Sequence, residues 1–267
     1  MPRHNRQQHE TAEQLGRRQF VQAAGLAASA AALGHNSLTA APSTSEQNNS
    51  PARPSQNADT EAGEIPTRPF GKTGVKLSAL GMGGHHLGDL KTVDDAIRLV
   101  YEAVDAGITF FDNCWEYWNG RAEDWLGRGL KGRRDKVFLM TKVCTHGRGA
   151  GLAMKMLDES LRRLQTDHLD LWQIHGVGFD NDPELAYAKG GVLEALDMAK
   201  RQGKTRFIGF TGHKDPDVHL DMIRRGFPFD SVQMPLNVLD ANFRSFEKKV
   251  LPELNERGIA VLGMKPM

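Results

Sequence analysis

Four side chains that can hold or transfer protons lie close behind short apolar segments of this 267-residue chain. Asp112, Lys142 and His175 each end one of three successive segments, and Tyr117 lies five residues after Asp112. If the segments are neighbouring parallel strands, which are spaced about 4.8 Å apart, the four side chains meet at one edge of a sheet. A phenol beside an ammonium group has its pKa lowered from an ordinary value near 10.

The set predicts a proton-transfer site in which Tyr117 is the general acid and Lys142 lowers its pKa. Asp112 is expected to keep Lys142 charged and oriented, and His175 to hydrogen-bond a substrate carbonyl. Each residue alone has a simpler interpretation. Asp112 could be a turn residue, Lys142 a solvated side chain and His175 a structural histidine. Tyr117 could belong to an aromatic cluster that covers the barrel. Their placement on three consecutive segments favours the functional interpretation.

The elements that would position these residues repeat about every 30 residues. Seven short apolar segments occur, at 77–82, 108–112, 137–142, 169–175, 206–211, 231–234 and 259–264. Continuous apolarity of this kind is typical of strands buried on both faces. Amphipathic helices are expected between most of them, at 92–104, 154–164, 192–199 and 246–257, with Pro252 kinking or dividing the last.

This alternation predicts an α/β fold, a (β/α)₈ TIM-type barrel incomplete at its C-terminus, with seven identifiable strands. Residues 68–76 are expected to form a hairpin that closes the barrel floor. The alternative is a doubly wound open sheet, but residues 81–88 (GMGGHHLG) lack its G-x-G-x-x-G spacing. We expect a loop rather than a helix after the first strand.

The first 66 residues differ in composition from the rest. Arg17 and Arg18 precede Phe20 and an Ala-rich stretch, a layout that resembles a twin-arginine export signal over 1–41. The alternative is a surface amphipathic helix that stays attached. Residues 42–66 are polar and are expected to be a disordered linker, with the barrel occupying 67–267. The protein is therefore expected to be periplasmic or exported, or cytoplasmic if the signal is not used.

Composition narrows the classes of partner. The chain has 34 Lys and Arg against 33 Asp and Glu, which disfavours nucleic-acid binding. Two cysteines exclude a disulfide scaffold and a four-thiolate zinc site. No apolar run of about 18 residues occurs, so no stable membrane span is expected. The expected partners are a small-molecule carbonyl or alcohol and the export machinery.

Several motifs together resemble the aldo-keto reductase family. Residues 110–117 (FFDNCWEY) contain its Asp followed five residues later by Tyr, and the likeness runs from about Arg68 to the end of the chain. It includes 68–74 (RPFGKTG), 141–143 (TKV), 161–164 (LRRL) and 170–175 (DLWQIH). The resemblance implies a barrel that binds a nicotinamide cofactor, usually NADPH, with a tetrad of Asp112, Tyr117, Lys142 and His175. Tyr117 would give the proton as hydride passes from cofactor C4 to a carbonyl carbon.

The resemblance also indicates where the cofactor would bind. The implied residues are Gly83, Asp112, Thr211, Gly212, Gln233, Met264 and Lys265. Thr211-Gly212 replaces the Ser-Asn pair that often holds the carboxamide, and Met264 takes the place of the stacking aromatic residue. The family's C-terminal portion, with an eighth strand and the segment that grips the 2′-phosphate, would lie beyond residue 267. NADP is the expected cofactor, and NAD is possible.

Some residues leave alternatives open. His85, His86 and His213 lack ligand spacing with a carboxylate or thiolate, so no metal site is expected. Cys114 and Cys144 are expected to be free thiols, although a disulfide in an oxidising compartment is the alternative. Trp115, Trp118 and Trp172 suggest an aromatic-lined pocket. The predicted function is reduction of aldehydes or ketones, or the reverse reaction, and the alternative is a weakly active or inactive barrel that senses a cofactor or binds a partner.

Overall fold

The computed structural model describes residues 64–144 and 149–266, which all lie in one compact unit spanning Gln56–Met267. The export signal predicted at 1–41 and nearly all of the linker predicted at 42–66 lie outside the described residues. The first strands are β1 (Thr67–Pro69) and β2 (Lys76–Ser78), which pair antiparallel. The predicted hairpin at the start of the barrel is therefore confirmed.

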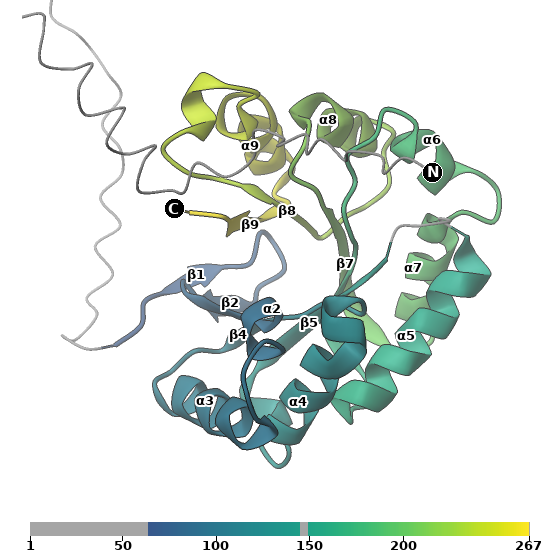
Figure 1. Ribbon diagram of the computed structural model, residues 1–267. Helices are drawn as coiled ribbons and strands as arrows, with labels where there is room; N and C mark the ends of the chain where they lie inside the picture. Colours follow the sequence, from purple (N-terminus) through teal and green to yellow (C-terminus); the bar gives the residue numbers. More distant parts are fainter. Residues whose placement is uncertain (1–63, 145–148, 267) are drawn as a thin grey trace, which may run out of the picture. The chain divides into compact units, whose positions relative to one another are not determined.

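Seven parallel strands form a single curled sheet in sequence order (Figure 1). They are β3 (Gly81–Gly83), β4 (Phe110–Asp112), β5 (Phe138–Val143), β6 (Leu169–Ile174), β7 (Thr205–Thr211), β8 (Ser231–Pro235) and β9 (Ala260–Met264). Each strand pairs with the next one along the chain, and β3 and β9 form the two edges of the sheet. The expected incomplete barrel with seven strands is confirmed, and the doubly wound alternative is wrong.

Helices lie outside the curved sheet, as Figure 1 shows. They are α2 (Gly84–Leu87), α3 (Val93–Asp105), α4 (Arg121–Gly129), α5 (Ala150–Leu164), α6 (Asp182–Tyr187), α7 (Val192–Arg201), α8 (Pro216–Arg224) and α9 (Phe246–Arg257), with 3-10 turns η1 (Tyr117–Gly120), η2 (Arg134–Lys136) and η3 (Asp240–Asn242). Thr92 caps α3, since its hydroxyl accepts the Asp95 backbone N–H at 3.1 Å. None of the helices in the described ranges is long and apolar enough to cross a lipid bilayer.

Two apolar clusters pack on opposite faces of the sheet. The larger lies between the strands and the helices, and all six residues of β5 and of β6 are buried. The smaller lines the inner face and includes the first residues of two strands, Phe110 and Phe138, together with Phe70 and Leu77 from the hairpin. The hairpin therefore covers the amino-terminal end of the strands, as the sequence predicts.

Three local expectations are wrong. The segment 77–82 is not one strand, because the chain turns at Ala79, whose N–H donates to Pro66 O at 2.7 Å, and the Ser78 hydroxyl donates to Leu80 O at 2.7 Å. The short helix α2 follows β3 directly, with Gly83 as its N-cap, where a loop was expected. Trp172, which was expected to line a pocket, is fully buried in the core.

Pro252 lies inside α9 without dividing it. An interior proline costs a helix about 3 kcal/mol. Burying an aliphatic or aromatic side chain contributes about 1.5–3 kcal/mol, and α9 buries three, Phe246, Val250 and Leu254. Packing of this face therefore outweighs the lost backbone hydrogen bond.

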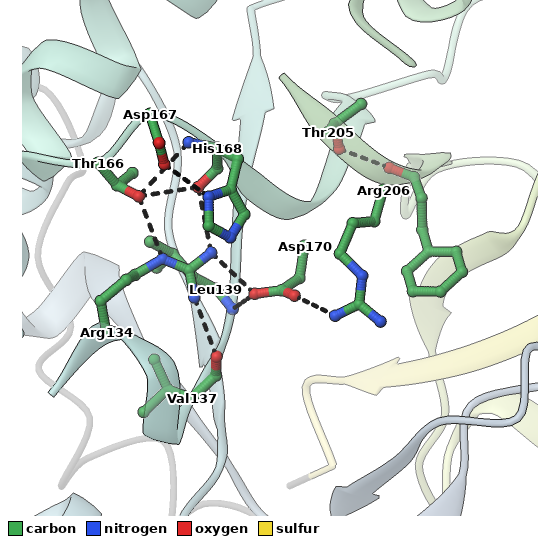
Figure 2. Close-up of polar contacts among 10 residues, drawn as sticks. Arg134, Val137, Leu139, Thr166, Asp167, His168, Asp170, Thr205 and Arg206 are labelled. Atoms are coloured by element: carbon green, nitrogen blue, oxygen red, sulfur yellow. Dashed lines mark hydrogen bonds and ion pairs between the residues drawn. The ribbon is translucent and has the colours of Figure 1, made fainter. Parts of the chain in front are cut away.

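A buried carboxylate ties three strands together near their amino-terminal ends (Figure 2). Asp170 in β6 is almost fully buried, accepts a hydrogen bond from the Leu139 backbone N–H of β5 at 2.9 Å and forms an ion pair with Arg134 Nη2 at 2.9 Å. Its other oxygen accepts from Arg206 Nη1 of β7 at 2.6 Å. Arg134 also donates to Val137 O at 3.0 Å. Its planar guanidinium group therefore links the residue before β5 to Asp170 of β6.

We expect the substitution Asp170→Asn to lower the free energy of unfolding by about 2–3 kcal/mol. Losing one partner of a buried ion pair is costly, and the cost stays at the low end because Arg134 and Arg206 keep some solvent contact. The matched control is Asp158→Asn, whose pair with Lys204 is more exposed and which we expect to change stability by less than about 1 kcal/mol. Urea unfolding measures both variants, and equal small effects would contradict this account of the barrel floor.

Candidate active site

Strand periodicity brings Lys142 to the inside of the barrel. Phe138 and Met140 lie on the inner face of β5, and Lys142, two residues further on, shares that face. Its almost fully buried ammonium group forms an ion pair with Asp112 Oδ1 of β4 and donates to Asn113 O at 2.7 Å. Burial alone would lower the pKa of Lys142, but Asp112 and other anionic neighbours raise it above its ordinary value. The ion pair with Asp112 thus favours the charged form of Lys142.

The second oxygen of Asp112 contacts a strand on the far side of the sheet. Asp112 Oδ2 accepts a hydrogen bond from Gln233 Nε2 of β8 at 2.8 Å, although β4 and β8 are not neighbours in the sheet. The contact therefore crosses the interior of the barrel. Within the described part of the chain, Gln233 Oε1 is buried and has no hydrogen-bond partner. A buried amide oxygen in this condition is an acceptor available to a ligand.

Tyr117 reaches the same ion pair from the loop after β4. Lys142 Nζ lies 5.2 Å from the centroid of the Tyr117 ring, and the His175 ring stands edge-on to that ring at a centroid distance of 5.9 Å. The structure thus brings the four residues of the predicted tetrad together at the carboxyl ends of the strands.

The expected direction of the Tyr117 pKa is wrong. Burial of the phenol raises its pKa above the ordinary value, and the opposing effect of the Lys142 ammonium is smaller. The sequence predicts the charged neighbour but not the extent to which the loop covers the ring. Tyr117 is therefore a protonated phenol at neutral pH, which is the form that donates a proton.

The backbone after Tyr117 turns sharply through residues with positive φ values. Trp118 and Asn119 both have a φ of 54°, and Gly120 has a φ of 87°. This φ favours glycine, and a Cβ atom at Gly120 would lie 2.3 Å from Arg163 Cζ, so the guanidinium group would have to move. The Trp118 indole N–H donates to His85 O at 2.8 Å and fixes this turn against α2.

Residues of α4 and α5, for which the sequence predicted no role, also hold the loop after β4 in place. Arg163 of α5 donates to Trp115 O at 3.0 Å and forms an ion pair with the fully buried Glu123 of α4. Glu123 accepts the Thr141 hydroxyl at 2.6 Å, next to Lys142 in β5. Burial raises the pKa of the Glu123 carboxyl despite these hydrogen bonds. Glutamate is common in the first turn of a helix. The sequence therefore cannot distinguish a buried Glu123 that pairs with Arg163 from a glutamate exposed to solvent.

His175 follows β6 and has two further neighbours that the sequence did not identify. His175 Nδ1 lies 2.7 Å from Glu116 Oε1 and 3.2 Å from Cys114 Sγ. Burial and the Lys142 charge lower the pKa of His175 to about 4, against the attraction of Glu116, so the ring is neutral at neutral pH. Glu116 also accepts a hydrogen bond from Cys144 Sγ at 3.2 Å.

Four of the predicted cofactor residues line one cavity of about 260 Å³ between the edge strands. They are Gly83, Asp112, Gln233 and Met264. Thr211 is buried at the end of β7, and the Gly212 N–H donates to Gln233 O at 3.2 Å. Lys265 is exposed, and its carbonyl accepts from Asn237 Nδ2 at 3.0 Å. Thr211, Gly212 and Lys265 are not among the residues that line the cavity, and Asp112 is the tetrad residue that reaches it.

Comparison with known proteins agrees with this arrangement. The model of the aldo/keto reductase family matches residues 79–267. An L-galactose dehydrogenase of Arabidopsis thaliana is 33% identical over 215 residues, covering 76% of this chain and 66% of its own length. The methylglyoxal reductase YeaE of Escherichia coli is 33% identical over 136 residues, covering 51% and 45%.

Solved structures show the same fold. An aldo-keto reductase from Bacillus halodurans, in its holo form, matches with a TM-score of 0.64 and 29% identity over 74% of this chain and 65% of its own. A Klebsiella pneumoniae enzyme in complex with NADP and acetate matches with a TM-score of 0.60 and 25% identity, covering 71% and 64%. The chain spans about two thirds or less of the length of the curated relatives named above. With its strand order, its inner ion pair and these likenesses, the chain belongs to the aldo/keto reductase family.

Proposed function

We propose that this chain is an NAD(P)-dependent oxidoreductase that reduces aldehydes or ketones to alcohols, or catalyses the reverse reaction. The observation that carries the proposal is the buried Lys142–Asp112 ion pair beside a protonated Tyr117. A neutral phenol next to a fixed ammonium group can give up its proton and leave a stabilised phenolate. The family relationship supports the same chemistry.

The residues around Gln233 suit the carboxamide of a nicotinamide ring. The unpartnered Gln233 Oε1 can accept an amide N–H, and the Thr211 hydroxyl lies at the end of the adjacent strand. When bound, the cofactor supplies the hydride at C4 of its nicotinamide ring. NADP is the proposed cofactor, since the Klebsiella pneumoniae relative is in complex with NADP, and NAD remains the alternative. Met264 replaces an aromatic ring with a polarisable thioether that can pack on a ring face.

The proposed steps of the chain's own side chains follow from their contacts. Tyr117 donates its phenolic proton to the substrate oxygen. Lys142 stabilises the phenolate that remains, and Asp112 keeps the ammonium group pointing inward. The neutral His175 ring, edge-on to Tyr117, is the second group available for a hydrogen bond to the same oxygen.

The substitution Tyr117→Phe tests the proposal. We expect it to reduce the rate of NADPH oxidation with a panel of aldehydes by about 10²–10⁴-fold, because the proton donor is lost, while NADPH binding measured by fluorescence is unchanged. Tyr101→Phe is the matched control, since Tyr101 is exposed on α3 and contacts Arg133. Equal rates in the wild type and Tyr117→Phe would remove Tyr117 from the mechanism. Cofactor binding without turnover of any carbonyl by the wild type would favour the cofactor-sensing or partner-binding alternative.

We also propose that residues 1–41 direct export of the folded protein, on the support of the Arg17-Arg18 pair and the Ala-rich stretch. Free NADPH is not expected outside the cytoplasm, and export in folded form would let the cofactor bind beforehand. We expect the periplasmic fraction of a host with a twin-arginine system to hold a product whose intact mass lacks this segment. The double substitution Arg17→Lys with Arg18→Lys should keep the full-length chain in the cytoplasm. Full-length cytoplasmic product in both cases would contradict export.

A further inference from the structure

Three ligand atoms of different chemistry converge beside the tetrad. Cys114 Sγ, a Glu116 carboxylate oxygen and His175 Nδ1 all lie within 4.8 Å of one another. Cys114 is fully buried, while the side chains of Glu116 and His175 are 38% and 21% exposed, so a route from solvent reaches the cluster. The proposed carbonyl chemistry gives no task to Cys114 or Glu116.

The hydrogen bond available to the Cys114 thiol in this cluster is long. His175 Nδ1 carries either one hydrogen or one lone pair, yet it faces the Glu116 oxygen at 2.7 Å and the Cys114 sulfur at 3.2 Å. If the ring donates to the carboxylate, the thiol hydrogen is left with the Lys142 carbonyl, 3.7 Å from the sulfur. A cation bound to all three atoms would satisfy a thiolate, a carboxylate and an imidazole lone pair together.

Two separations, from His175 Nδ1 to the Glu116 oxygen and to the Cys114 sulfur, are close to those of a zinc site, and the third is below 4.8 Å. Zinc binds nitrogen and carboxylate oxygen at about 2.0–2.1 Å and sulfur at about 2.3 Å, so tetrahedral geometry separates N from O by about 3.3 Å and N from S by about 3.5 Å. The two separations here are 2.7 and 3.2 Å, and each would open by only about 0.3–0.6 Å. A rotation of the half-exposed Glu116 side chain would open the first separation, and a small shift of the His175 ring or of the Cys114 side chain would open the second.

Charge balance also suits a divalent ion. The other buried carboxylates nearby already have cationic partners, Asp112 with Lys142 and Glu123 with Arg163. A thiolate at Cys114 would face only the Lys142 ammonium, which Asp112 already neutralises, and Glu116 has no lysine or arginine partner among the ion pairs of the described residues. A divalent ion would neutralise both.

We propose that Cys114 Sγ, Glu116 and His175 Nδ1 form a binding site for a borderline-soft divalent ion of the Zn²⁺ class, with a fourth position open. Binding releases the thiol hydrogen as a proton and leaves the ring hydrogen of His175 on Nε2. That tautomer is the one that donates a hydrogen bond, so, on the proposed function, metal binding would prepare His175 for a carbonyl oxygen. Cys144, which contacts the other oxygen of Glu116 at 3.2 Å, positions the carboxylate and is not a ligand.

Cobalt titration tests the site through its sulfur ligand. The full chain is freed of metal by dialysis against a chelator and titrated with CoCl₂, with the thiolate-to-cobalt absorption band as the readout. The chain has two cysteines, so the band reports Cys114 or Cys144. We expect one Co²⁺ per chain with this band, displaced by ZnSO₄. Weak binding to other histidines gives no such band.

Matched variants assign the ligands without using enzyme turnover. Cys114→Ser should abolish the band, and Cys144→Ser, the control, should retain it. Glu116→Gln should keep the band but weaken cobalt binding at least tenfold, and it serves as the second variant if circular dichroism shows that Cys114→Ser does not fold. Absence of a stoichiometric band in the wild type, its survival in Cys114→Ser, its loss in Cys144→Ser, or unchanged affinity in Glu116→Gln would overturn the proposal. Because no carbonyl is reduced in this assay, its outcome is separate from that of the reductase proposal.

Discussion

The buried ammonium group of Lys142 is the constraint on which the site depends. Removing one charge from water costs several kcal/mol unless anions and carbonyls replace the lost solvent. Asp112 and the Asn113 carbonyl supply that replacement, and both come from the end of β4. The pairing fixes the end of β4 against β5 and sets where the loop carrying Tyr117 must begin. The second oxygen of Asp112, Oδ2, accepts a hydrogen bond from Gln233. The interior of the barrel is therefore polar where the predicted cofactor residues meet.

The two ends of the strands divide structural and chemical roles. Near the amino-terminal ends, both carboxylate oxygens of Asp170 have partners, the Leu139 N–H and Arg134 on one side and Arg206 on the other (Figure 2). At the carboxyl ends, Gln233 Oε1 lacks a hydrogen-bond partner within the described residues, and His175 Nδ1 lies near both Glu116 and Cys114. Satisfied polar groups stabilise a fold, whereas unsatisfied ones mark places where a ligand completes the structure. This difference, rather than the number of polar residues, separates the floor from the site.

The sequence predicts the strands and the meeting of the tetrad because both depend on short-range patterns. Apolar runs mark buried strands, and a residue that ends one strand lies beside the residue that ends the next. The contacts of Cys114 and Glu116 depend instead on the loop after β4, where Trp118 and Asn119 adopt positive φ values that no local signal requires. The raised pKa of Tyr117 was beyond prediction for a similar reason, since it follows from burial that many distant residues create. The division of 77–82 into two strands likewise depends on the hydrogen bonds that Ser78 exchanges with Thr109, the residue before β4.

The central claim is that Lys142 and Asp112 stabilise one another inside the barrel, and a double-mutant cycle tests it most directly. The free energy of unfolding is measured in urea for the wild type, Asp112→Asn, Lys142→Met and the double variant. Residues that interact directly show coupling of about 0.5–3 kcal/mol, and for a pair this deeply buried we expect at least about 1 kcal/mol, with the double variant more stable than the sum of the single effects implies. Additivity within about 0.5 kcal/mol would show that the two charges act independently and would contradict the account.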